Sequence, residues 1–297
     1  MVGQYGGRRL MNREGILSEV AREVWAIQSE WLESALATVA SRNMTPVAAT
    51  PSQPAKSAVA VVPVYGPISK RPNFLTLLFG GATTEAISTQ LKSLVADPGV
   101  KAIVLDIDSP GGTVGGMIEL AEEIRGMRGT KPIFAVANPL MASAAYCIGA
   151  QAGEVIATPS SLTGSIGVFM LHMDYSRMLE QGGVKPTFIQ FGENKTLGNP
   201  MEPLSDDARS EFQRIVDSAG RDFVRAVANG RKVTQSTVME KFGQGLIFTA
   251  QDAVRHGLAD RILTLDEVLA GLGASTSAAR GRSRAQQWRD IQRVGLA

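Results

Sequence analysis

The sequence of 297 residues is poor in the side chains that many enzymes use for catalysis or metal binding. It contains one cysteine, Cys147, and two histidines, His172 and His256. A single cysteine excludes an internal disulfide and fits a reducing compartment, so we expect a cytoplasmic protein. The common zinc ligand sets are hard to assemble from so few residues, and we expect no metal. Neither histidine has neighbours that suggest a Ser/His/Asp triad, and Cys147 is expected to face the core.

Long apolar runs and an excess of one charge are also missing. No stretch of about eighteen apolar residues could span a bilayer, and the first residues lack the apolar core and cleavage site of a secretory signal. We therefore expect neither a membrane anchor nor export. The formal net charge is only +2, which gives no strong signal for nucleic acid as a partner.

Three regions differ in composition. Residues 1–57 combine a helical pattern over 14–40, with apolar residues at one-turn spacing, and a linker rich in proline and alanine. Residues 58–272 carry the apolar patterns of a globular core. Residues 273–297 are rich in arginine and predict a mobile basic tail, for which acidic scaffold or DNA remain possible partners.

The central region alternates between strand and helix patterns, which is typical of an α/β fold. Strands are expected near 59–65, 100–107, 133–137, 155–157, 167–173 and 187–191. Helices are expected near 84–95, 113–127, 143–150, 206–229, 235–241 and 250–256. Residues 74–79 form an apolar loop in this interpretation, which lines a substrate groove, meets another subunit or packs in the core.

Ser143 and Lys195 together provide the parts of a nucleophilic site that needs no histidine. A serine hydroxyl attacks a carbonyl only if a neighbouring group takes its proton, and lysine can do so when its amine is neutral. Burial away from water favours the neutral amine. The pair therefore predicts a dry pocket around Lys195.

The Gly111-Gly112 pair follows the buried strand expected at 100–107, with Pro110 ending that strand. Glycines allow a substrate to approach the backbone closely, and we expect the N–H groups of Gly111 and Gly112 to lie at the start of the next helix. One of these amides and the amide of Ala144 would form a two-donor oxyanion hole. No cofactor is needed for such chemistry.

Each of these residues also has an ordinary structural explanation. Ser143 alone would more often be a helix cap, and Lys195 alone a surface charge. Gly111 and Gly112 could be a simple strand-to-helix turn, and Ser165 a turn hydroxyl. The combination of the motifs in one chain makes the catalytic interpretation stronger than any single residue does.

Four motifs occur in order: Asp-Ser-Pro-Gly-Gly at 108–112, Met-Ala-Ser-Ala-Ala-Tyr at 141–146, Thr-Gly-Ser-Ile-Gly-Val at 163–168, and Asn-Lys at 194–195 before Gly-Asn-Pro at 198–200. In sequence and in the spacing from Ser143 to Lys195, the chain resembles the signal peptide peptidase A family of serine peptidases over residues 58–272. The resemblance implies a Clp-protease/crotonase-like superfold that assembles into oligomers. It also implies that Ser143 is the nucleophile, Lys195 the base and Ser165 the hydroxyl that orients the lysine.

The N-terminal helix and linker resemble the phage and prophage branch of that family, whose members act on scaffold and capsid proteins during head maturation. Three alternatives remain open at this point. The chain could be a cellular peptidase that degrades membrane or cytosolic peptides. It could be a crotonase-like enzyme that is not a peptidase, or an inactive capsid-assembly protein.

Overall fold

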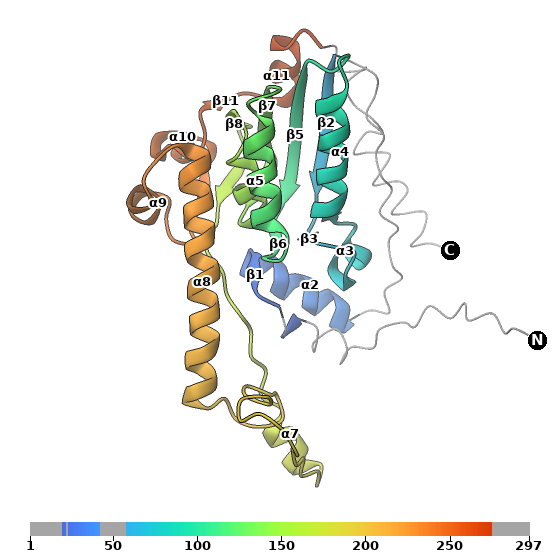
Figure 1. The fold of residues 1–297 in the computed structure, drawn as a ribbon, viewed down its shortest axis with the longest axis vertical. Helices are drawn as coiled ribbons and strands as arrows, with labels where there is room; N and C mark the ends of the chain where they lie inside the picture. Colours follow the sequence, from blue (N-terminus) through green and yellow to red (C-terminus); the bar gives the residue numbers. More distant parts are fainter. Residues whose placement is uncertain (1–19, 22, 42–57, 275–297) are drawn as a thin grey trace, which may run out of the picture.

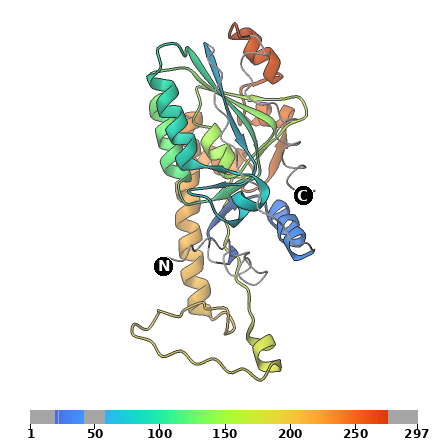
Figure 2. The same ribbon diagram turned by 90° about the vertical axis from the view of Figure 1, so that its right-hand side faces the viewer.

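The computed structural model describes residues 20–21, 23–41 and 58–274. The predicted linker and almost all of the predicted basic tail lie outside these residues. Figures 1 and 2 show a body of sheet and helices from which one long helix and a connecting segment project. Within the described residues no helix is both long and apolar enough to cross a membrane.

A seven-stranded sheet forms the body. Its central strands run parallel: β2 (Val59–Tyr65), β5 (Ala102–Ser109) and β7 (Ile133–Ala142) lie side by side in that order. β7 is long enough to pair with two strands, β8 (Glu154–Ala157) through its first half and β9 (Leu162–Gly164) through its last residues. β10 (Ile247–Thr249) joins β9 antiparallel, and β11 (Arg261–Ile262) joins β8 in parallel.

The two faces of this sheet bury different residues of the same strands. Along β5, Ile103, Leu105 and Ile107 belong to the main core, whereas Ala102 and Val104 belong to a smaller cluster on the opposite face. This alternation follows from the two-residue repeat of a strand. A strand that is buried on both faces reads as a continuous apolar run, which is why the sequence located it.

Helices cover both faces. The main core lies under α4 (Thr84–Ala96), α5 (Met117–Met127), α6 (Ala144–Gly149) and the C-terminal half of α8 (Asp206–Arg231). α11 (Leu265–Gly271) covers the smaller cluster on the other face. α9 (Gln235–Lys241) and α10 (Ala250–His256) contribute Val238, Ala250 and Ala253 to the main core.

Hydroxyl caps fix the starts of the C-terminal helices. The side chains of Ser205, Thr234, Thr249 and Thr264 each accept a hydrogen bond from a backbone N–H in the first turn of α8, α9, α10 and α11. Such caps are local in sequence. The predictions for α9 and α10 therefore agree with the structure to the residue, and that for α8 ends two residues early.

A second, four-stranded sheet lies beside the first, in the order β1 (Trp25–Ile27), β6 (Gly111–Thr113), β3 (Ile68–Ser69) and β4 (Ala82–Thr83). α2 (Ser29–Ser41) follows β1, and α3 (Phe74–Phe79) lies between β3 and β4. Trp25, Ile27, Leu32, Phe74 and Leu75 form a separate hydrophobic cluster that joins these elements.

The structure corrects several sequence-based expectations. Among the described residues, the helix predicted over 14–40 is interrupted, because residues 25–27 form β1 and the helix that follows covers 29–41. Residues 111–113 form β6, so the next helix begins at Met117 and not at 113. The apolar loop at 74–79 is α3, with its first three residues buried and Asn73 as its cap. No strand forms at 167–173 or at 187–191. In the first of these ranges, Phe169 makes an isolated bridge to Trp25.

Candidate active site

Ser143 lies between the end of β7 and the start of α6, at the carboxyl edge of the parallel strands. Its backbone has φ 54° and ψ −119°, a conformation that costs a residue with a side chain about 1–3 kcal/mol. Two backbone hydrogen bonds hold it there, from Ser143 N–H to the Gly164 carbonyl at 2.7 Å and from Cys147 N–H to the Ser143 carbonyl at 2.9 Å. Hydrogen bonds at both its N–H and its carbonyl group therefore hold Ser143 in this strained conformation.

The hydroxyl group of Ser143 is buried, and no hydrogen-bond partner for it lies among the described residues. A buried polar group without a partner is costly, and native structures tolerate it mainly where function requires it. A serine acting only as a helix cap would place its hydroxyl on a first-turn amide. Ser143 makes no such bond to α6, so its side chain is not used as a cap.

The Gly-Gly strand and the first amide of α6 lie against Ser143. A Cβ built on Gly111 would lie 2.9 Å from Ser143 Cβ and 3.0 Å from the Ala144 nitrogen, so a side chain at Gly111 would fill the space beside the serine. Gly111 also has φ 101°, which favours glycine. Its N–H donates to Ser109 Oγ at 3.2 Å.

Gly111 and Gly112 use their amides differently. The Gly111 N–H donates to the Ser109 side chain, whereas Gly112 pairs with the backbone of Ala26 in β1 on the edge of β6 beside the serine. The sequence left open which of the two glycines would serve as an oxyanion donor. We take Gly112, with Ala144, as the candidate pair because a substrate also offers a backbone carbonyl.

Ser165 follows Gly164, the residue whose carbonyl holds the Ser143 amide. It has φ 54°, and its own N–H donates to the Leu246 carbonyl at 2.7 Å. Ser165 is thus one residue away from the carbonyl group that accepts the Ser143 hydrogen bond. The Ser165 hydroxyl is predicted to orient Lys195, but Lys195 does not lie beside it in this chain.

Lys195 is exposed to solvent, so the dry pocket predicted around it is absent from the single chain. It lies in a series of turns between Gly192 and Asn199, where its N–H donates to the Gly192 carbonyl at 3.1 Å. These turns belong to the connection from β9 to α8, which also carries α7 (Ser176–Gln181) and extends away from the body (Figures 1 and 2). The structure brings Ser143, Gly111, Gly112, Ala144 and Ser165 together but leaves Lys195 outside.

Seven apolar side chains are exposed on this same connection, which we call the projecting segment (residues 170–204). They are Leu171, Met178, Val184, Phe188, Ile189, Phe191 and Met201, with Ile189 99% and Phe191 100% exposed. Single exposed apolar residues are common on proteins, but a concentration on one projecting element marks an interaction surface. The strand predicted at 187–191 would have buried Phe188, Ile189 and Phe191, but it does not form.

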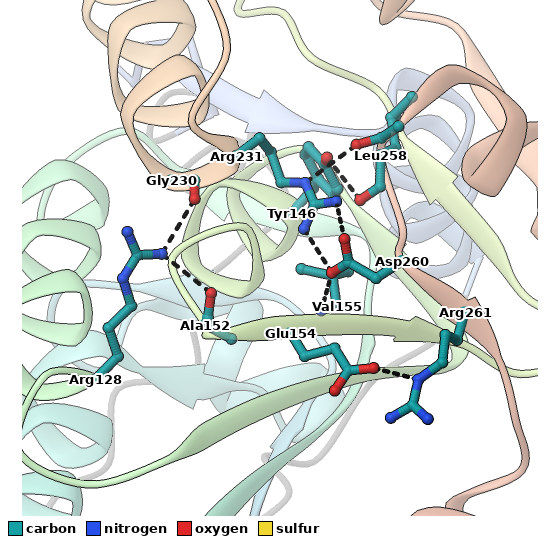
Figure 3. A network of polar contacts seen from close by, with 11 residues as sticks. Arg128, Tyr146, Ala152, Glu154, Val155, Gly230, Arg231, Leu258, Asp260 and Arg261 are labelled. Atoms are coloured by element: carbon teal, nitrogen blue, oxygen red, sulfur yellow. Dashed lines mark hydrogen bonds and ion pairs between the residues drawn. The ribbon is translucent and has the colours of Figure 1, made fainter.

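A polar network joins α6 and the residues that follow it to Leu258 and to the end of α8 (Figure 3). The hydroxyl of Tyr146 in α6 donates to the Leu258 carbonyl at 3.0 Å, and burial raises the pKa of this phenol well above its ordinary value. Arg128 donates from one nitrogen to the carbonyls of Gln151, Ala152 and Gly230, each at 3.1 Å. These bonds tie the region after α6 to the end of α8.

α8 meets α6 at close range. A Cβ on Gly230 would lie 2.4 Å from the Ala150 carbonyl oxygen, and Gln151 donates to the Ala226 carbonyl at 3.0 Å. Only a glycine permits this approach. The helix that carries the projecting segment is therefore fixed at its other end to the helix that begins at the nucleophile.

The residues of this site are suited to acyl transfer. Across the described residues no three His, Cys, Asp or Glu side chains gather in a way that could hold a metal ion. The burial of Cys147 raises the pKa of its thiol, which opposes formation of the reactive thiolate. Ser143 is thus the nucleophile candidate in this region.

Comparison with known proteins agrees with this geometry. The model of peptidase family S49 matches residues 126–278, a range that includes Ser143, Ser165 and Lys195. The chain is 32% identical over 224 residues to capsid assembly protease C of Escherichia phage lambda, covering 75% of this chain and 51% of the relative. It is 33% identical over 231 residues to head-tail preconnector protein GP5 of Enterobacteria phage P21, covering 77% and 45%.

A plant protein is also similar. The chloroplast serine protease SPPA of Arabidopsis thaliana is 27% identical over 213 residues, which is 71% of this chain and 31% of the relative. The chain spans about half the length of the two phage proteins that it matches. Because the family model matches more than half of the sequence, the chain belongs to peptidase family S49.

Proposed function

We propose that the protein is a serine endopeptidase with a Ser143/Lys195 dyad, built on the Clp-protease/crotonase-like superfold. The observation that carries the proposal is the strained, buried Ser143, whose unpaired hydroxyl lies beside backbone amides that can receive an oxyanion. A crotonase-like enzyme that is not a peptidase would need the amides but no serine held in this way.

Lys195 completes this site, in our proposal, from a neighbouring copy of the chain. Two observations support this arrangement: Lys195 is exposed, and the projecting segment that carries it also exposes Ile189 and Phe191 almost fully. Packing of the segment against a second copy would remove these apolar side chains from water, which is favourable. The same contact would bury the amine next to the serine of the other copy and favour its neutral form.

The reaction then proceeds as acyl transfer. The neutral Lys195 amine takes the proton of the Ser143 hydroxyl as the oxygen attacks the scissile carbonyl. The amides of Gly112 and Ala144 stabilise the negative charge on the carbonyl oxygen. Lysine returns the proton to the leaving nitrogen, and water then releases the acyl group. Because the base must be uncharged, activity should rise as the pH is raised from acidic values.

The substrate class that we propose is the set of scaffold and capsid proteins of a phage head, inside a procapsid in the host cytoplasm. The support is similarity to phage proteins named as a capsid assembly protease and a head-tail preconnector protein. This part of the proposal is independent of the chemistry at Ser143. It would fail if the enzyme cleaved model peptides but left phage scaffold and capsid proteins intact.

Complementation between two inactive variants tests the dyad. Ser143→Ala and Lys195→Ala should each lower the hydrolysis of a fluorogenic peptide by on the order of 10⁴-fold or more. Co-expression of the two variants should restore part of the activity, because a chain with an intact serine can then meet a chain with an intact lysine. Lys185→Ala, an exposed lysine on the same projecting segment, is the matched control and should remain active.

The alternatives give different results in this experiment. If serine and lysine met within one chain, co-expression would restore nothing. If Lys195→Ala alone kept full activity, the base would have to be another group. If Ser143→Ala kept activity, the serine peptidase proposal would be wrong.

A further inference from the structure

A segment of the chain itself lies next to Ser143, between the edge of β6 and Phe169, and we call this position the groove. β1 runs antiparallel to β6, with Trp25 opposite Thr113, Ala26 opposite Gly112 and Ile27 opposite Gly111. Flanking hydrogen bonds join Val114 N–H to the Val24 carbonyl at 3.0 Å and Gln28 N–H to the Pro110 carbonyl at 2.9 Å. The Gly-Gly strand therefore has the backbone of residues 24–28 along its free edge.

These flanking bonds also determine which residue faces the oxyanion donor. In an antiparallel ladder, hydrogen-bonded pairs alternate with pairs that are not hydrogen-bonded. Val24 bonds to Val114 and Gln28 to Pro110, so the pair midway between them, Ala26 and Gly112, is a hydrogen-bonded one. The Ala26 carbonyl is thereby directed at the Gly112 amide.

The other edge of the segment is paired as well. Trp25 N–H donates to the Phe169 carbonyl at 2.9 Å, and Phe169 N–H donates to the Trp25 carbonyl at 3.0 Å. Residues 24–28 thus form a strand held between two backbones. An extended peptide bound by main-chain hydrogen bonds on a strand edge is a common mode of peptide recognition.

The Ala26 carbonyl oxygen lies close to Ser143 and Ala144. A Cβ on Gly111 would be 2.3 Å from this oxygen, 2.9 Å from Ser143 Cβ and 3.0 Å from the Ala144 nitrogen. The carbonyl oxygen is therefore no more than about 5 Å from each of the latter two atoms. The Ala26–Ile27 peptide bond thus lies beside the candidate nucleophile.

The side chains of the segment fit this position. Ala26 is fully buried and belongs to the main core, whereas Trp25 and Ile27 point to the separate cluster with Leu32 and Phe74. The residue that would donate the scissile carbonyl is therefore enclosed by core side chains. A small apolar residue at this position defines the substrate class that the groove accepts.

We propose that the enzyme cleaves its own Ala26–Ile27 bond, using Ser143 of the same chain. The inference rests on the peptidase function proposed above and names a substrate for it. The Ser143 oxygen bonds to the Ala26 carbonyl carbon as the bond to the Ile27 nitrogen breaks, and the hydroxyl proton passes through the base to that nitrogen. One water molecule then releases the Ala26 carboxylate and restores the serine.

Two consequences follow. Until this bond is cut, residues 24–28 occupy the groove and compete with any other substrate. Cleavage separates residues 1–26 from a chain that begins at Ile27, and it opens the positions of Val24, Trp25 and Ala26 to a second peptide. Self-cleavage would therefore precede full activity on other proteins.

The test follows the full-length chain by intact-mass spectrometry and N-terminal sequencing. Wild type should convert to a species that begins at Ile27, whereas Ser143→Ala and Lys195→Ala should remain uncut. Ala26→Gly should still be cut, because glycine is smaller than alanine and keeps the same backbone hydrogen bonds. Ala26→Asp should not be cut, because an unpaired buried charge is costly there. Ala37→Asp, at an exposed position of α2, is the matched control and should be cut as in wild type.

A fluorogenic peptide added to the same samples separates the two proposals. Because a charged side chain at position 26 keeps the segment out of the groove, Ala26→Asp should hydrolyse this peptide although it is not cut itself. Its activity also reports that the variant is folded. If wild type hydrolyses the peptide through Ser143 but keeps its Ala26–Ile27 bond, self-cleavage is wrong and the peptidase function stands. If wild type does neither, both proposals fail.

A mixed assembly tests whether the reaction occurs within one chain. A tagged Ser143→Ala chain co-expressed with untagged wild type should keep its Ala26–Ile27 bond, because its own groove holds its own segment. Removal of residues 1–26 from the tagged chain would overturn the assignment to Ser143 of the same chain.

Discussion

Arg231 and Asp260 form an ion pair with two contacts, from Nη1 to Oδ2 at 2.9 Å and from Nη2 to Oδ1 at 2.6 Å. The pair joins the last residue of α8 to the approach to β11, and Asp260 also accepts a hydrogen bond from the Val155 amide of β8 at 2.7 Å. Through this contact the projecting helix is fixed to the edge of the main sheet. The position of the projecting segment relative to Ser143 thus depends on residues far from both.

Asp260→Asn should destabilise the protein at neutral pH by about 1–2 kcal/mol, because Arg231 would lose a charged acceptor. Burial alone would raise the pKa of Asp260, but hydrogen bonds from Arg231 and the Val155 amide hold it below its ordinary value. The folded state therefore binds the proton less readily than the unfolded state. The stabilisation is present above pH 4 and disappears as the pH falls through the lowered pKa.

Denaturant titrations at several pH values check this prediction. The difference in unfolding free energy between wild type and Asp260→Asn should shrink from neutral pH towards pH 3. Asp222→Asn removes an exposed ion pair with Arg225 on the same helix and should change stability by at most about 0.5 kcal/mol. A difference that grew on acidification would contradict the assigned direction.

Gly111→Ala should lower kcat/KM by on the order of 10²–10³-fold, the size of effect seen when an oxyanion donor is lost. The added methyl would occupy the space where a substrate carbonyl oxygen lies, as the 2.3 Å approach to the Ala26 oxygen indicates. Gly115→Ala is the control, because a Cβ at this nearby glycine meets nothing within 4 Å. Equal activity of the two variants would show that Gly111 does not border the substrate.

Cys147 should be unreactive in the native protein. It is fully buried in α6, and burial raises the pKa of its thiol. Ellman's reagent should therefore label the folded enzyme far more slowly than the same enzyme in guanidinium chloride, where one thiol per chain should react. Rapid stoichiometric labelling of the folded enzyme would mean that α6 opens readily.

Charges introduced on the projecting segment should disrupt assembly. The double variant Ile189→Asp/Phe191→Asp replaces two almost fully exposed apolar side chains with carboxylates, which cannot be buried cheaply against a second copy. Light scattering after size exclusion should show a smaller species than wild type, with peptidase activity lost in parallel. Met239→Asp changes an exposed apolar residue on α9 and should leave the mass unchanged.

Many elements of the fold could be predicted because their signals are local. The all-apolar run of β5 locates a buried strand, and hydroxyl caps such as Thr234 and Thr249 mark helix starts within three residues. Phe74–Phe79 was misread as a loop because its cap, Asn73, follows a short strand and the helix has only six residues. Short elements carry too few repeats for a period to be recognised.

The N-terminal segment shows where local signals fail. Val24, Ile27 and Trp31 fit the three- and four-residue spacing of an amphipathic helix. Trp25 and Ile27 fit the two-residue repeat of a strand. The strand forms because β6 and Phe169 supply hydrogen-bond partners on both edges, and these residues lie far away in the sequence. Residues 187–191 show the reverse case, since an apolar pattern typical of a strand finds no partner strand in the part of the chain that the structure describes.

The sequence by itself determined the family, the nucleophile candidate and the oxyanion motif, because each depends on short runs of residues whose local geometry is fixed by glycine, proline and strand-to-helix turns. Only the tertiary structure decided that Lys195 is exposed to solvent in its own chain and that Ala26 is buried beside Ser143. Both positions depend on contacts between distant segments. A backbone that needs hydrogen-bond partners takes the free edge that the folded chain offers, and no local pattern specifies which edge that is.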